Sequence, residues 1–118
     1  MAAGIYNILA EEGATFARTI TWRDSNDALV NLSGYSARMQ VRPTIDNSDQ
    51  TATLSLTTDN GRILLGGTSG TVTLTVSAGD MTVPEGQYVY DLEMLSSGGV
   101  TVTRLLQGTF VVSGEVTK

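Results

Sequence analysis

Apolar residues recur at every second position in short runs, and turn-forming residues interrupt these runs about every ten residues. In the clearest run, residues 35–42, one face carries Tyr35, Ala37, Met39 and Val41. Such alternation places apolar side chains on one side of a β-strand and polar side chains on the other. No run has the length and the 3.6-residue period of a helix. Residues 77–85 are the least strand-like and could hold one helical turn near residues 78–81.

The pattern predicts an all-β fold of about eight to ten short strands. The expected strands are residues 5–9, 15–23, 28–32, 35–42, 51–57, 62–65, 71–76, 87–95, 100–107 and 109–112. Pro43 is expected to end one strand because proline cannot donate to a ladder, and Gly108 is expected to break the last run in two. In the predicted strand at residues 15–23, Arg18 lies on the face that otherwise carries Phe16, Ile20 and Trp22. The inward faces suffice for two sheets, so we expect one antiparallel β-sandwich over residues 1–118. Its expected core contains Tyr35, Met39, Leu54, Leu74, Tyr90 and Leu92.

Composition supports strands and excludes several kinds of chemistry. The chain has 118 residues, the length of one domain, and among them are 17 Thr, 11 Val and 5 Ile, which favour strands. It has no histidine and no cysteine. A Ser-His-Asp triad, a cysteine nucleophile, a disulfide and a Cys/His zinc site are therefore excluded. We predict no enzyme activity and no cofactor.

The net charge of −5 argues against two kinds of partner. A nucleic-acid binder needs a basic surface, and an anionic membrane attracts basic segments, so we expect neither partner. The beginning of the chain lacks the basic and apolar regions of a signal peptide, and no apolar run approaches the roughly 18 residues of a membrane span. We expect a chain that is made and folded in a cytoplasm.

Four charged residues are candidates for an interface. Arg38 and Arg42 share the outward face of one predicted strand, and Asp91 and Glu93 share that of another. Cross-strand pairing would satisfy all four charges, within the sheet or across a subunit contact. The two carboxylates lie about 7 Å apart by strand geometry, within the range of a glycosidase pair. Solvated or paired carboxylates are the better interpretation, so no catalytic residue is assigned.

Other candidate sites are weaker. The acidic loop at residues 24–27 lacks the further ligand and the glycine of a calcium loop, and a turn is the better interpretation. The glycine-rich residues 66–70 lack the lysine and the following helix of a phosphate loop. No metal site is assigned. Trp22 lies near a strand end and is a candidate ligand contact, although inward aromatic residues of a small sandwich usually belong to the core.

The strand edges and the chain ends are candidate docking elements. The outward strand faces are rich in Thr and Ser and carry few lysines that would guard an edge against pairing. Residues 1–6 and 113–118 are short and apolar enough to dock. We therefore expect association with other proteins or with copies of the same chain.

Five stretches carry a resemblance to a known group of proteins. They are residues 12–16, 21–24, 32–42, 86–93 and 103–110. Together they resemble small proteins encoded among the structural genes of tailed bacteriophages and prophages, and more distantly the N-terminal domain of phage baseplate upper proteins. The resemblance covers nearly the whole chain. It implies an immunoglobulin-like β-sandwich located in the virion, and it implies no active site.

The expected function is that of a non-enzymatic structural component of a tailed bacteriophage virion. Such a component would be assembled in the host cytoplasm as an assembly or attachment module of the tail, baseplate or neck. Its expected partners are other virion proteins and copies of itself. One alternative is a capsid decoration protein. Another is a carbohydrate- or receptor-binding module that would contact a host surface glycan through Trp22 and polar loops.

Overall fold

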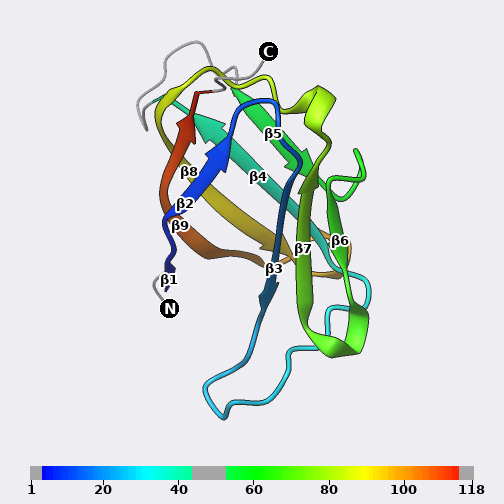
Figure 1. Ribbon diagram of the computed structural model, residues 1–118. Coiled ribbons are helices and arrows are strands. Elements are labelled where there is room, and N and C mark those ends of the chain that lie inside the picture. Colours follow the sequence, from blue (N-terminus) through cyan, green and yellow to red (C-terminus); the bar gives the residue numbers. More distant parts are fainter. Residues whose placement is uncertain (1–3, 44–52, 115–118) are drawn as a thin grey trace.

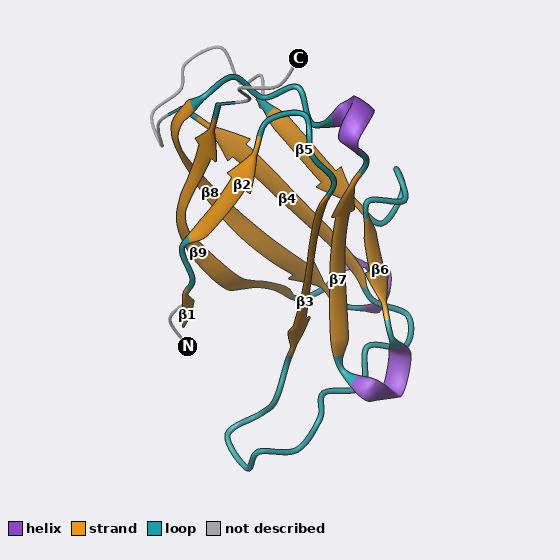
Figure 2. Cartoon of the chain, in the orientation of Figure 1, coloured by secondary structure: helices purple, strands orange, loops and turns teal. Residues whose placement is uncertain are grey.

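Two β-sheets face each other in the computed structural model, which describes residues 4–43 and 53–114 (Figure 1). The larger sheet contains β1 (Gly4–Ile5), β2 (Ile8–Glu11), β4 (Ser36–Arg42), β5 (Leu54–Thr57), β8 (Gly86–Leu95) and β9 (Val102–Ser113). The smaller sheet contains β3 (Phe16–Thr21), β6 (Ile63–Leu65) and β7 (Thr71–Val76). Within these described residues, three short 3-10 helices lie in the loops: η1 (Gly67–Ser69), η2 (Ala78–Asp80) and η3 (Ser97–Gly99) (Figure 2). The predicted helical turn near residues 78–81 is confirmed by η2.

The strand order is that of an immunoglobulin domain. The larger sheet runs β1–β9–β8–β4–β5, with β2 also pairing with β9, and the smaller sheet runs β3–β7–β6. An immunoglobulin sandwich places its strands B, E and D in one sheet and its strands C, F and G in the other. Here β3, β7 and β6 take the places of B, E and D, and β4, β8 and β9 take those of C, F and G. Near the start of β8, the Tyr88 hydroxyl donates a 2.8 Å hydrogen bond to the Pro84 carbonyl, as in the tyrosine corner of that fold. The predicted all-β sandwich is confirmed.

One part of the larger sheet departs from the predicted antiparallel arrangement. Both β1 and β2 run parallel to β9, whereas the other strand pairs are antiparallel. The predicted strand at residues 5–9 is therefore two short strands with a kink at Tyr6 and Asn7. The parallel pairing joins the first and last strands of the described chain.

The core lies between the two sheets. Alternate positions of β4, β7 and β8 are buried, which is the expected consequence of their two-residue period. Five of the six residues predicted for the core are buried, whereas Tyr35 is only partly buried at its margin. The ring of Phe110 lies 5.5 Å from that of Phe16 and 6.4 Å from that of Tyr90, centroid to centroid. These aromatic contacts join the last strand to both sheets.

The predicted strand at residues 28–32 is absent, and this prediction was wrong. Only one isolated bridge forms there, between Arg23 and Leu29. The Asp24 carboxylate accepts hydrogen bonds from the backbone N–H groups of Asn26 and Ala28, at 2.9 and 3.0 Å. These local bonds hold the backbone in a turn and compete with a regular ladder. The segment is a loop that projects from the sandwich (Figure 1).

Gly108 does not break the last strand, so that prediction was also wrong. β9 continues through Gly108, which pairs with Tyr90 of β8. A Cβ atom at position 108 would lie only 2.6 Å from the Tyr6 carbonyl oxygen and 2.7 Å from Oδ1 of Asn7. The glycine therefore permits the kink between β1 and β2 to cross close to β9.

Two arginines link the two sheets by hydrogen bonds on opposite sides of the sandwich. Arg18 points inward from β3, lies 4.9 Å from the centre of the Phe16 ring, and donates a 2.7 Å hydrogen bond to the carbonyl of Leu9 in β2. On the other side, Arg62 donates a 3.0 Å hydrogen bond to the carbonyl of Ser55. Arg18 thus joins the edge strand β3 to β2, and Arg62, directly before β6, joins that edge of the smaller sheet to β5. This explains why Arg18 interrupts an apolar face.

We expect Gly108→Ala to destabilise the fold by about 1–3 kcal/mol, because the added methyl group collides with backbone atoms of the kink. Gly79→Ala is the matched control, since no atom lies within 4 Å of the Cβ position there. The free energy of unfolding, measured by chemical denaturation, checks both variants. Equal stabilities for the two variants would contradict the close crossing.

Candidate functional site on the outer face of the larger sheet

The outer face of the larger sheet carries side chains in three cross-strand rows. Each row takes one residue from each of several neighbouring strands, as the strand register requires. The rows are Arg38–Glu93–Arg104, Gln40–Asp91–Gln107–Ile5 and Arg42–Val89–Thr109. Most of these side chains are polar, and they point away from the core. The face is therefore the main concentration of paired charges on the described sandwich.

The structure brings together the four charged residues selected from the sequence and confirms a cross-strand ion pair between Arg38 and Glu93, whereas Asp91 pairs with Arg104. Arg38 Nε lies 2.7 Å from Glu93 Oε1, in a pair whose Glu93 side chain is 23% exposed. Asp91 Oδ2 lies 3.4 Å from Nε of Arg104. Arg42 donates from Nε and Nη2 to Oε1 of Gln40, at 3.1 and 2.7 Å. Their role at an interface stays a prediction.

Arg104 reaches this face because of a β-bulge, and the sequence analysis did not select it. The register between β8 and β9 shifts after Leu92, so that Leu92 pairs with Leu106 while Glu93 pairs with Arg104. Leu105 is the extra residue, and strict alternation would have turned Arg104 toward the core. Residues 103–106 show no alternation that could have revealed the bulge. Gln40 and Gln107 were missed because uncharged amides on a strand give no distinctive signal.

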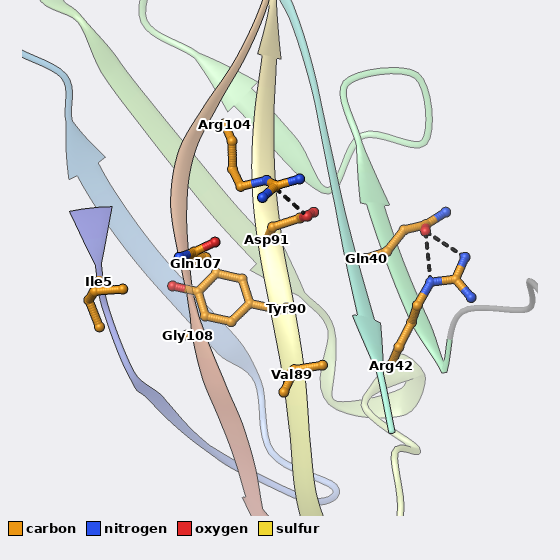
Figure 3. A pocket seen from close by; sticks show the side chains of 9 residues that line it. All are labelled: Ile5, Gln40, Arg42, Val89, Tyr90, Asp91, Arg104, Gln107 and Gly108. Atoms are coloured by element: carbon orange, nitrogen blue, oxygen red, sulfur yellow. Dashed lines mark hydrogen bonds and ion pairs between the residues drawn. The ribbon is translucent and has the colours of Figure 1, made fainter. Parts of the chain in front are cut away.

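A hollow of about 440 Å³ opens on this face (Figure 3). Its lining includes the polar side chains of Gln40, Asp91 and Gln107, with Arg42 and Arg104 beside them. The apolar part of the lining comes from Ile5, Val89 and Tyr90, together with Gly108. Four strands of the larger sheet thus contribute to the hollow, and β1 supplies one wall.

The carboxyl group of Asp91 is partly withdrawn from water. This burial raises its pKa above the ordinary value, and the negative charge of Glu93 raises it further. Arg104 acts in the opposite direction, as do Arg38 and Arg42. A carboxylate with incomplete hydration is a strong acceptor for a hydrogen-bond donor that enters the hollow. The arrangement is therefore suited to binding a ligand that offers hydroxyl or N–H groups.

Trp22 lies apart from this face. It follows β3 directly, its ring packs edge-on against Tyr35 with 6.1 Å between centroids, and it is half-buried against the core. Its backbone N–H donates to the carbonyl of Gly70 at 2.8 Å. The structure thus gives Trp22 a packing role, and its ligand contact stays a prediction.

The candidate docking termini are described only in part. Gly4 and Ile5 pair with Leu106 and Gln107, and the Tyr6 N–H donates to the Gln107 carbonyl at 3.0 Å. This part of the N-terminus is therefore bound to its own domain. Residues 1–3 and 115–118 lie outside the described residues.

The described residues contain neither a candidate metal cluster nor a helix that could span a membrane. Across residues 4–43 and 53–114, no group of three or more acidic side chains is arranged to hold a metal ion. No helix in those ranges has the length and apolar character needed to cross a membrane. No protein-family model matches the chain, and neither does any curated protein.

We expect Glu93→Gln to lower the pKa of Asp91, because it removes the nearby negative charge that raises it. Arg104→Gln should move the same pKa upward, because it removes the cation paired with Asp91. Titration of the side-chain carboxyl carbon by NMR measures both changes. Shifts in the same direction for the two variants would show that Asp91 does not lie between these charges.

Proposed function

We propose that the chain is a non-enzymatic structural module of a tailed bacteriophage virion, where it joins neighbouring subunits of the tail, baseplate or neck. The resemblance of five sequence stretches to phage structural proteins supports the viral context. The observation that carries the role in assembly is the composition of the outer face of the smaller sheet.

That face is uncharged throughout its described strands. Its outward positions hold one alanine, five threonines and one leucine: Ala17, Thr19, Thr21, Thr71, Thr73, Thr75 and Leu64. The threonines stand in cross-strand register, with Thr19 opposite Thr73 and Thr21 opposite Thr71. Leu64 is 62% exposed. We call this surface the threonine face.

An uncharged face is suited to an interface in an acidic protein. The chain carries a net charge of −5, so charged surfaces of two copies repel each other. A contact between such surfaces also removes water from their charged groups, which costs free energy. The threonine face can be covered without burial of a charge. Its methyl groups offer apolar contact, and its hydroxyl groups can exchange hydrogen bonds with a neighbour.

The edges of the same sheet support the proposal. Within the described residues, β3 and β6 each pair with one strand only, on the side of β7. Their other sides present backbone groups to a neighbour, although Arg18 occupies part of the region next to β3. A subunit that covers the threonine face would therefore also reach the sheet edges, which offer backbone hydrogen bonds.

Thr73→Lys tests the proposal, because Thr73 lies at the centre of the threonine face. We expect about a tenfold loss of the chain from purified particles, since a neighbour would have to cover an unpaired ammonium group. Thr68→Lys is the matched control, because Thr68 is exposed in the loop that contains η1. Mass spectrometry of gradient-purified particles measures the copy number, and chemical denaturation verifies that both variants fold.

Two outcomes would overturn the proposal. One is the absence of the wild-type chain from purified particles. The other is incorporation of Thr73→Lys at the level of Thr68→Lys. Separation of tails from capsids before the measurement tests the location of the chain. Recovery of the chain in capsids alone would favour a capsid decoration protein over a component of the tail, baseplate or neck.

A further inference from the structure

The hollow on the outer face of the larger sheet has the size and the mixed walls of a small-ligand site. Its volume of about 440 Å³ lies within the range of roughly 300–1,000 Å³ that is typical of such sites. Ile5, which is 70% exposed, stands on one side, and Val89 supplies apolar surface on β8. A ligand could place its apolar surface against these side chains while its polar groups meet the row between them.

That row presents an amide, a carboxylate and a second amide side by side. Gln40, Asp91 and Gln107 occupy matching positions on β4, β8 and β9. Neighbouring strands lie about 4.8 Å apart, a spacing comparable with the length of one sugar ring. Oε1 of Gln40 accepts from Arg42 and Oδ2 of Asp91 is paired with Arg104, so Nε2 of Gln40 and Oδ1 of Asp91 are the atoms that these two residues offer to sugar hydroxyl groups. Among the described residues, no group forms a hydrogen bond with the side-chain amide of Gln107, which leaves it available to a ligand.

The carboxylate in the middle of the row favours a ligand that places hydroxyl groups, and not an anionic group, against it. Asp91 stands in the middle of the row, and its carboxylate would repel an incoming carboxylate or phosphate. The Arg104 guanidinium is paired with Asp91, and the Arg42 guanidinium is bound to Gln40. Sugar hydroxyl groups can donate to Asp91 and accept from the amides, and the C–H faces of a sugar can lie on Ile5 and Val89.

We propose that this hollow binds a neutral oligosaccharide. The binding function is separate from the assembly role proposed for the threonine face, because the two surfaces lie on opposite outer faces of the sandwich. The binding residues are Gln40, Asp91 and Gln107, with Ile5 and Val89 as the apolar contacts.

NMR titration of the isotope-labelled chain tests the proposal. The probes are maltotriose, chitotriose and mannotriose at millimolar concentrations. We expect at least one of them to cause saturable shifts that are centred on the backbone amides of residues 89–91 and 104–108. Gln107→Ala should weaken that binding about tenfold, the effect of one lost hydrogen bond with its supporting contacts. Thr68→Ala, in the exposed loop that contains η1, is the matched control and should leave the affinity unchanged.

Three results would overturn the proposal. The first is the absence of shifts at these amides with all three trisaccharides. The second is equal affinity for the wild type and Gln107→Ala, when the spectrum of the variant shows that it is folded. The third is tighter binding of tri-galacturonic acid than of every neutral probe, which would assign the hollow to an anionic ligand.

Discussion

The crossing of the N-terminal chain over Gly108 holds the two ends of the described chain together. At this point the Tyr6 carbonyl accepts a hydrogen bond from the Tyr90 hydroxyl, and Oδ1 of Asn7 accepts one from the N–H of Thr109 at 3.1 Å. Burial raises the pKa of the Tyr90 hydroxyl, with a smaller contribution from Tyr6, so that hydroxyl keeps its proton and remains a donor. The crossing sets the parallel register that buries Ile8 and places the exposed β1 beside the hollow.

The two outer faces arise from one alternating pattern and differ in chemistry. Outward positions of β8 and β4 carry charges and amides, whereas those of β3 and β7 carry threonine and alanine. The charged face satisfies its ions internally, through pairs such as Arg38 with Glu93. The threonine face has no charge to satisfy, so a neighbouring subunit can cover it at little cost. Under the two proposals, one face binds a small ligand while the other contacts the particle.

Alternation alone predicted the strands and buried faces of β4, β7 and β8, because their periods are regular and their side chains face one core. The failures have long-range causes. Gly108 resembled a strand break because the approach of Tyr6 could not be seen in local sequence. Arg104 was not selected, because strict alternation would place it toward the core and the bulge at Leu105 cannot be recognised without its partner strand. The candidate site was therefore predicted on β4 and β8 and missed on β9 and β1.

The parallel pairing across Gly108 can be tested directly by nuclear Overhauser effects between backbone protons. We expect contacts between Gly4 and Leu106 and between Ile8 and Phe110, with Tyr6 close to the α-protons of Gly108. This order of contacts, in which the residue numbers rise together on both strands, is specific to a parallel pairing. A reversed order, or contacts of residues 4–10 with a strand other than β9, would contradict the crossing and the wall that β1 gives to the hollow.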